Sequence, residues 1–505
     1  MNNSNSIPAM SSSPSLAGRA VLAVVLMIGF YLLAVAIACG LIYIPYAEMT
    51  YAHRLHIKLA LFCVLGALAI LWSVLPRPDK FEAPGPELTR AQHPQLFTEL
   101  DGVAKSVSQA MPAEVYLVPE VNAWVMQRGG IMGFGSRRVM GLGLPLMRTL
   151  TRSQFRAVLA HEFGHYYSGD TQLGPWIYKT RGAIGRTLQS LGEGSWLQLP
   201  FLWYGKLFLR ITHAVSRRQE FVADELAARA VGSRPLIGGL RTIHGVAPAF
   251  DAFWMQECAP VLNAGYLPPV AEGFQRFIQA GPVAEAIHRS LDEELKTGKV
   301  DPYDTHPPLK ERIAAVEHLP AGDSGTDDPP ATTLLADLPG IEDVLVATLV
   351  KPEIAENMKP IHWDDVCFSV YFPQWTSLAQ ANTATLSGVT PESLPLLGAD
   401  LKSFGLRLRT PDGEMPDEEN AEGLASAVLG SVLTVLLVSR GGKVQSEPGQ
   451  SVSVTVGSTT IETFGILRSF TDSKLTAEEW QRQCRELGIA GLDFGKVTTA
   501  TQAGR

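Results

Sequence analysis

The chain contains little charge and few cysteines. Only 18% of its 505 residues are charged, the formal net charge is −8, and no run of basic residues is longer than a pair. These features exclude the basic surface that nucleic-acid binding needs, so we expect no nucleic-acid partner. The five cysteines are scattered without the spacing of metal ligands, which argues against a disulfide framework and a cysteine zinc site.

Hydrophobic residues, by contrast, make up 46% of the chain and form two long uncharged runs. Residues 20–44 are long enough to cross a bilayer, which takes about 20 residues, and residues 59–75 lie at the short end of that range. A cleaved signal peptide fits poorly, because the first run is too long and a second run follows. We therefore predict a disordered tail over residues 1–19 and a transmembrane hairpin over residues 20–76.

Basic residues around the two runs suggest an orientation. Four flank the ends of the hairpin and two lie in its connecting loop: Arg19, Arg77, Lys80 and Arg90, against Arg54 and Lys58. Because positive charge favours the cytoplasmic side, both ends of the hairpin and the part of the chain that follows it are expected in the cytoplasm. The chain is thus predicted to be an integral protein of the bacterial plasma membrane.

A third feature, the segment 151–170, carries a motif with chemical meaning. Thr151 and Gln154 have the spacing of a helix capping box, and apolar residues then recur with helical periodicity. His161 and His165 lie one turn apart on such a helix, so both imidazoles can reach one ion. Glu162 lies beside them as a candidate general base. The alternative is a surface helix that carries two histidines by chance.

Zinc in catalytic sites takes three protein ligands, so another ligand is needed. The best candidate lies in the alanine-rich helical segment 216–232, where Glu220 and Asp224 share one face. We assign Glu220 to the metal and Asp224 to a ligand histidine N–H behind it. Taken alone, two acids on such a helix are more often solvated.

These motifs resemble a known family. The segments HEFGH and SRRQEFVAD, together with Asn122-Ala123-Trp124 and Thr305-His306-Pro307-Pro308 followed by Arg312, are similar to the membrane-bound zinc metallopeptidases of the M48 family, the Ste24/HtpX-like gluzincins. The resemblance covers residues 92–317. It implies a gluzincin-like domain with one Zn²⁺ per chain.

The resemblance also implies further roles. His306 would stabilise the oxyanion, and Arg312 would brace the Glu220 carboxylate by a bidentate pair. Asn122 and Ala123, on an edge strand, would bind the substrate backbone. The alternatives are a histidine that simply precedes a helix, a surface arginine and an asparagine that starts a turn.

The pattern around these motifs predicts a soluble domain over residues 77–319. A helix is expected from residue 92, and short strands are expected over 114–118, 122–127 and 138–144, around a glycine-rich turn at 129–135. The aromatic segment 196–215 is broken by Pro200 and contains two basic residues, so a spanning helix is not favoured. It fits either an amphipathic segment at the membrane or cleft, or ordinary core packing.

Beyond a linker at 320–339, the family resemblance ends and an accessory domain follows over residues 340–505. Strands are predicted at 366–372, 402–408 and, as a hairpin, 452–466; helices are predicted at 422–438 and after Thr476. The fold class is therefore α+β, mainly helical. It comprises a transmembrane hairpin, a metallopeptidase domain with a small sheet, and an accessory domain without a recognisable catalytic constellation.

The function predicted from the sequence is that of a zinc metalloendopeptidase. Its partners would be peptide or protein substrates, such as misfolded membrane proteins, and the lipid bilayer. Two alternatives stay open: a non-catalytic membrane adaptor and a prenyl-protein-processing endopeptidase. The sequence does not indicate an oligomeric state.

Overall fold

The computed structural model describes residues 14–75, 81–129, 135–165, 174–192, 194–297, 306–322 and 327–500. These form two compact units: unit 1 contains Met1–Gly245 and Arg289–Leu338, and unit 2 contains Val246–His288 and Pro339–Arg505. The segment 246–288, which the sequence placed in the peptidase domain, thus belongs to unit 2. The first helix begins at Pro14, inside the predicted tail, and residues 1–13 lie outside the described residues.

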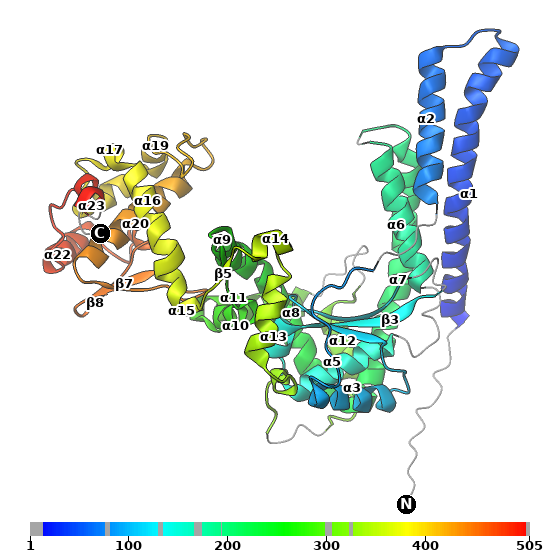
Figure 1. Cartoon of the computed structure of the whole chain (residues 1–505), viewed down its shortest axis with the longest axis horizontal. Helices are drawn as coiled ribbons and strands as arrows, with labels where there is room; N and C mark the ends of the chain where they lie inside the picture. Colours follow the sequence, from blue (N-terminus) through cyan, green and yellow to red (C-terminus); the bar gives the residue numbers. More distant parts are fainter. Residues whose placement is uncertain are drawn as a thin grey trace, which may run out of the picture. The chain divides into compact units, whose positions relative to one another are not determined.

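Unit 1 begins with the predicted hairpin, in which α1 (Pro14–Tyr51) and α2 (Ile57–Val74) lie side by side (Figure 1). Their facing sides pack through residues such as Phe30 and Ala67, while the outer sides expose large apolar residues. By length and composition, three described helices are apolar enough to cross a membrane: α1, α2 and α20 (Ala421–Ser439). The transmembrane hairpin predicted from the sequence is confirmed.

The aromatic segment after residue 196 is not separate from the helix that carries Glu220. A single helix, α7 (Gln198–Val231), contains both, and α6 (Gly174–Ser190) runs beside it. Pro200 lies in the first turn of α7, where the backbone N–H has no partner within the helix, so it does not break the helix. The sequence therefore placed a break where the structure has none.

A small sheet lies next to these helices. It contains β1 (Glu114–Val118), β2 (Ala123–Arg128) and β3 (Arg137–Gly143) in the order β1-β3-β2. Strand β3 pairs parallel with β1 and antiparallel with β2, so β2 is an edge strand, as the sequence predicts. Residues 130–134 of the predicted glycine-rich turn lie outside the described residues.

Further helices complete unit 1. Their bounds are α3 (Pro94–Ser106), α4 (Leu144–Thr149), α5 (Arg152–Gly164), α8 (Ser233–Phe253), α11 (Gly281–Thr297), α12 (Leu309–Val316) and the 3₁₀ turn η3 (Ala331–Leu334), with α8 and α11 continuing into unit 2. Part of the predicted linker packs on this unit, because Arg152 N donates to Pro329 O at 2.8 Å and Ala331 N donates to Leu150 O at 2.9 Å. The segment 327–335 is therefore an ordered part of the peptidase unit.

Unit 2 is organised around α20, whose residues Val428–Leu437 are all buried. The other elements of unit 2 are η2 (Trp254–Cys258), α9 (Ala259–Asn263), β4 (Tyr266–Leu267), α10 (Val270–Gln279), α13 (Leu338–Ala347), α14 (Pro352–Ala355), β5 (Lys359–Pro360), α15 (Trp363–Val366), η4 (Cys367–Tyr371), α16 (Phe372–Ala381), α17 (Thr383–Leu386), η5 (Pro391–Ser393), α18 (Leu394–Gly398), α19 (Leu401–Gly405), β6 (Lys443–Gln445), β7 (Ser453–Val456), β8 (Thr459–Glu462), α21 (Ile466–Thr471), α22 (Ala477–Glu486) and α23 (Phe494–Ala500).

Predictions for unit 2 were partly right. The β7–β8 hairpin, the buried helix α20 and the capping box of Thr476 with Glu479 are confirmed. The strands predicted at 366–372 and 402–408 are wrong, since the first segment is helical and the second is helical to Gly405 and then turns. The periodicity of a short apolar run does not distinguish a strand from a buried helix. In the structure, α16 and α19 pack against α20 as helices.

Candidate metal centre

Helix α5, which carries His161 and has His165 as its C-cap residue, has a start that its local sequence determines. Thr151 and Gln154 form the predicted capping box, with the Thr151 hydroxyl accepting from Gln154 N and the Gln154 side chain accepting from Thr151 N. Phe155 and Phe163 are fully buried on its apolar face. This packing sets the rotation of the helix, so that His161 and His165 point towards α7.

Small residues let α5 and α7 approach closely. A Cβ added to Gly164 would lie 3.1 Å from the Cα of Ala223, which is tighter than ordinary van der Waals contact. Ala223 itself is fully buried between Glu220 and Asp224 in sequence. The alanine-rich character of the second helix therefore has a structural consequence, because it brings the acidic face of α7 up to the two histidines.

The three predicted metal ligands converge. Nε2 of His161 lies 3.5 Å from Glu220 Oε2, and Nε2 of His165 lies 3.7 Å from Glu220 Oε1. Ligand atoms about 2.1 Å from a tetrahedral zinc ion are about 3.4 Å from one another. One donor atom from each side chain lies within 4.8 Å of the other two, so the side chains are spaced as a metal site requires.

The surroundings of Glu220 provide a physical test of this fit. Its side chain is buried, and Oε2 lies 3.4 Å from Arg312 Nη2 and 3.2 Å from His306 Nδ1. These contacts are ion pairs, and none of them has the alignment of a well-formed hydrogen bond to that oxygen. A buried carboxylate needs positive charge nearby; Arg312 supplies part of it, and a bound metal ion would add to it. Two imidazoles and this oxygen form a donor set that suits zinc.

Asp224 and Arg312 form a second layer behind the ligands. Asp224 is fully buried, and its Oδ1 lies 2.9 Å from His161 Nδ1, where it can hold the ring with Nε2 towards the centre. The expected bidentate pair between Arg312 and Glu220 is wrong. Arg312 instead donates from Nε and Nη2 to the two oxygens of Asp224, at 2.8 Å and 2.7 Å. One oxygen of Glu220 is thereby left for a metal.

The other predicted residues surround this centre. His306, just before α12, lies against Glu220 with its side chain 56% exposed, so one side of its ring faces solvent. Asn122 is exposed, and its carbonyl accepts a hydrogen bond from Gly143 N at 2.8 Å. Ala123 begins the edge strand β2 with a buried side chain, so only its backbone is suited to contact a substrate.

Burial and charge shift the acid–base properties of the centre. Burial raises the pKa of Glu162 to about 7. Burial also lowers the pKa of His165 to about 4. For His161, burial lowers the pKa but the carboxylates of Asp224 and Glu220 outweigh it and raise it to about 10. Burial opposes ionisation of Glu220, yet the adjacent His161 and His306 hold its pKa below the ordinary value.

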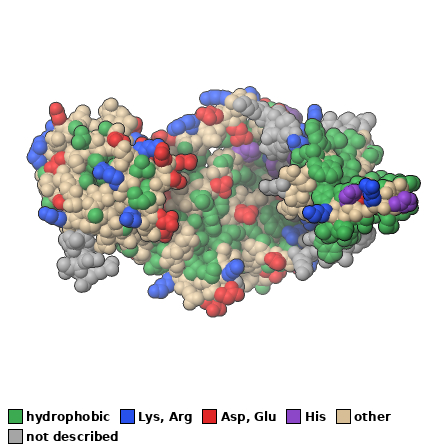
Figure 2. All heavy atoms as spheres, turned by 90° about the horizontal axis from the view of Figure 1, so that it is seen from above, with side chains coloured by type: hydrophobic (Ala, Val, Ile, Leu, Met, Phe, Trp, Pro, Cys, Tyr) green, Lys and Arg blue, Asp and Glu red, His purple; other side chains and the backbone are tan. Residues whose placement is uncertain are grey.

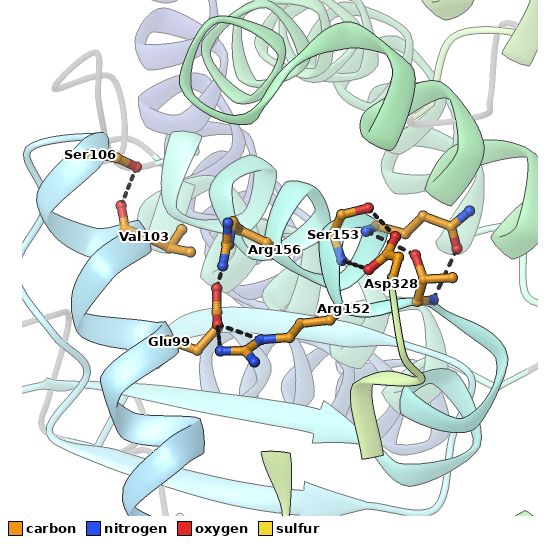
Figure 3. A network of polar contacts seen from close by, with 9 residues as sticks. Glu99, Val103, Ser106, Arg152, Ser153, Arg156 and Asp328 are labelled. Carbon is orange, nitrogen blue, oxygen red and sulfur yellow. Dashed lines mark hydrogen bonds and ion pairs between the residues drawn. The ribbon is translucent and has the colours of Figure 1, made fainter. Parts of the chain in front are cut away.

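Another buried carboxylate, which the sequence analysis missed, supports the opposite end of α5 (Figure 3). Glu99 of α3 is buried and accepts from Arg152 Nε and Nη2 at 2.9 Å and 2.7 Å, and it also pairs with Arg156. Asp328 accepts from Ser153 N at 2.9 Å and from its hydroxyl at 2.5 Å. The only signal for Glu99 was its position on the apolar stripe of α3.

Comparison with known proteins agrees with this geometry. The model of peptidase family M48 matches residues 90–319, which contain every residue of the centre. Residues 90–319 are thus similar to the peptidases of family M48, and this match covers a little less than half of the chain. The match excludes most of unit 2.

The individual relatives of the chain are distant. A protease HtpX homolog of Chlorobium phaeobacteroides is 26% identical over 204 residues, or 36% of this chain and 56% of the relative. Protease HtpX of Vibrio cholerae is 26% identical over 248 residues, or 44% of this chain and 71% of the relative. The chain thus spans little more than half of the first relative. No solved structure matches it.

Proposed function

We propose that this chain is a zinc-dependent endopeptidase. The observation that carries the proposal is the convergence of His161, His165 and the buried Glu220 from two helices at distances that suit a tetrahedral ion. These three side chains would hold the zinc. When bound, zinc supplies Lewis-acid chemistry, polarising a carbonyl group and lowering the pKa of water.

The protein's own residues have distinct roles in hydrolysis. Glu162, next to the proposed ligand His161, takes a proton from the water that attacks the scissile carbonyl and passes it to the leaving amine. His306, beside Glu220 and partly open to solvent, donates to the developing oxyanion. Asp224 and Arg312 hold His161 in position.

Substrate binding is assigned to the edge of the sheet. Strand β2 pairs only with β3 among the described strands, so its free edge can align an extended peptide by backbone hydrogen bonds. Asn122 adds a side-chain contact at the start of this edge, next to Ala123. The substrates are peptide segments near the membrane surface, such as those of misfolded membrane proteins.

The cytoplasm is the proposed location of the peptidase domain, with α1 and α2 in the bacterial plasma membrane. The excess of basic residues at the hairpin ends supports this orientation. A protease-protection assay on intact spheroplasts tests it. Degradation of the peptidase domain by protease added outside would contradict the proposal.

The decisive experiment combines metal content with activity. The purified full-length protein should cleave casein, lose activity on zinc chelation and recover it when zinc is restored. Glu162→Gln should reduce turnover by about 10²- to 10⁴-fold while zinc stays bound. Glu225→Gln, which removes a surface partner of Arg229 on α7, is the matched control and should keep full activity.

Each alternative gives a different result in that experiment. A Glu162→Gln variant as active as wild type would remove the proposed base. Absence of cleavage by a zinc-loaded wild-type protein would favour the non-catalytic adaptor. Cleavage restricted to prenylated peptides would favour the prenyl-protein-processing enzyme.

A further inference from the structure

The α6–α7 hairpin packs along the transmembrane helices (Figure 1). The four helices α1, α2, α6 and α7 share one apolar core, in which Phe30, Ile70, Ile184, Phe201 and Phe208 are buried. Neither α6 nor α7 is among the described helices apolar enough to cross a membrane. The α6–α7 hairpin therefore packs beside the candidate membrane-spanning helices, although neither of its own helices, as described, is both long enough and apolar enough to span a membrane.

Contacts between the helices show how far the hairpin reaches along α2. Near the end of α2, the Ser73 hydroxyl lies 2.8 Å from that of Thr187, and Arg186 Nε donates to Ser73 O at 3.1 Å. At the tip of the hairpin, the Trp196 ring lies 6.4 Å from that of Phe62. From Phe62 to Ser73 the helix rises about 16 Å. A bilayer core is about 30 Å thick, so the tip reaches roughly its middle.

The outward face of α7 is apolar at the same level. Trp203 is 72% exposed and Trp196 is 63% exposed, and Leu199, Leu202 and Leu207 are also exposed. Figure 2, seen from above, shows hydrophobic side chains covering the sides of the bundle that α1 and α2 help to form. An apolar surface of this kind marks a partner or a membrane, and at Trp196 it adjoins the exposed apolar surface of α2 near Phe62.

Basic side chains limit how deeply the α6–α7 hairpin can enter a bilayer. Arg186 lies level with the end of α2, and Lys206 and Arg210 lie one and two turns beyond Trp203, towards the peptidase domain. The Lys206 ammonium lies 5.9 Å from the centre of the Trp203 ring. Tryptophan next to lysine or arginine is typical of the boundary between acyl chains and headgroups.

We propose that the α6–α7 hairpin enters the bilayer from the side of the peptidase domain, contacts acyl chains through Trp196, Leu199 and Trp203, and turns back without crossing. Its turn leans on α1 and α2, where Leu197 packs beside Gly66, and irregular backbone within a membrane needs such protein cover. Helix α7 then continues out of the bilayer to Glu220. Ten residues separate Arg210 from Glu220, which places this metal ligand about 15 Å along the helix from the boundary.

Site-directed fluorescence in vesicles tests this proposal on the full chain. Single cysteines replace Trp203, Trp72 or Arg229 in a variant without the five native cysteines, each is labelled with bimane, and the protein is reconstituted in phosphatidylcholine–phosphatidylglycerol vesicles. Trp72 is the reference on α2 and Arg229 the exposed reference on α7. Casein cleavage by each unlabelled variant checks that the chain is folded.

The expected result is that lipid brominated on its acyl chains quenches the label at residue 203 at least about half as strongly as the label at residue 72. Aqueous iodide should quench only residue 229. A residue 203 label that responds like residue 229 would overturn the proposal. Ser195→Cys tests crossing separately: labelling by a membrane-impermeant maleimide from the vesicle face opposite to residue 229 would show that the hairpin spans the bilayer, which would also overturn it.

Discussion

Two buried glutamates at opposite ends of α5 show how different a buried carboxylate can be. Glu99 is surrounded by arginine donors from the first turns of α5, so its charge is balanced by the protein. Glu220 faces two imidazoles at the other end of the helix, and its Oε2 receives no well-formed hydrogen bond from any described group. The donors of the first arrangement all come from well-formed hydrogen bonds of the protein, whereas the second leaves a carboxylate oxygen in ion pairs only, where it can also bind a metal.

This difference is a guide to function. A carboxylate whose donors are all supplied by the protein stabilises the fold, and removing it should cost stability. A carboxylate whose donors are incomplete marks a binding site, and removing it should cost the ligand. Four measurements test whether Glu220 binds a ligand while Glu99 stabilises the fold.

The largest effect is expected from Glu220→Gln. A neutral amide offers no anionic oxygen to the metal, so the variant should lose nearly all of its zinc and its proteolytic activity. Zinc content by mass spectrometry and casein cleavage are the readouts, with Glu99→Gln as the matched variant that keeps its zinc. Stoichiometric zinc in Glu220→Gln would show that another donor completes the site.

Asp224→Asn should have an intermediate effect. The asparagine keeps the size of the side chain but loses the charge that holds His161 Nδ1 and pairs with Arg312. Loss of such a partner typically weakens metal affinity by about 10- to 100-fold. Competition with a chelator of known affinity measures this value, and an unchanged zinc affinity would remove Asp224 from the positioning role.

Glu99→Gln should affect stability and leave the metal in place. The amide cannot neutralise Arg152 and Arg156, so we expect a loss of about 2 kcal/mol in the unfolding of the peptidase unit. Glu225→Gln, at a surface pair, should cost less than about 0.5 kcal/mol. Urea unfolding followed by limited proteolysis compares the two, and equal midpoints would refute a stabilising role for the Glu99 cluster.

The smallest effect is expected from low pH, which should reduce folding stability by protonating the carboxylates at the start of α5. Burial raises the pKa of both Glu99 and Asp328, but their partners outweigh this effect. The adjacent arginines hold the pKa of Glu99 below 4.5, and hydrogen bonds from Ser153 hold the pKa of Asp328 below 3.8. A carboxyl group whose pKa is lower in the folded state contributes stability above its unfolded pKa and loses it as the pH falls.

Wild-type stability should therefore fall below about pH 4.5, by roughly 1 kcal/mol per carboxyl group for each unit of pKa shift. Glu99→Gln should show a shallower decline, because it lacks one of the titrating groups. Urea midpoints measured between neutral and acidic pH provide the comparison. A parallel decline in both proteins would exclude Glu99 as a source of acid sensitivity.

Much of the fold follows from local sequence signals. The transmembrane hairpin, the capping box on α5 and the edge strand β2 each depend on residues that are close in the chain or on a clear period. Segments 366–372 and 402–408 were misassigned because a short apolar run fits either a strand or a buried helix. Pro200 was read as a break, although a proline in the first turn is compatible with a helix.

For the candidate metal centre, local sequence supplied the chemical groups: two histidines one turn apart, an acid beside them and an acidic pair on an alanine-rich helix include the donor set that could hold a metal ion. Tertiary structure alone decided which partners these groups have. The bidentate pairing of Arg312 with Asp224, the arginines around Glu99 and the position of α7 beside α1 join residues far apart in the chain. No local pattern encodes such contacts, because they depend on how closely packed helices orient their side chains.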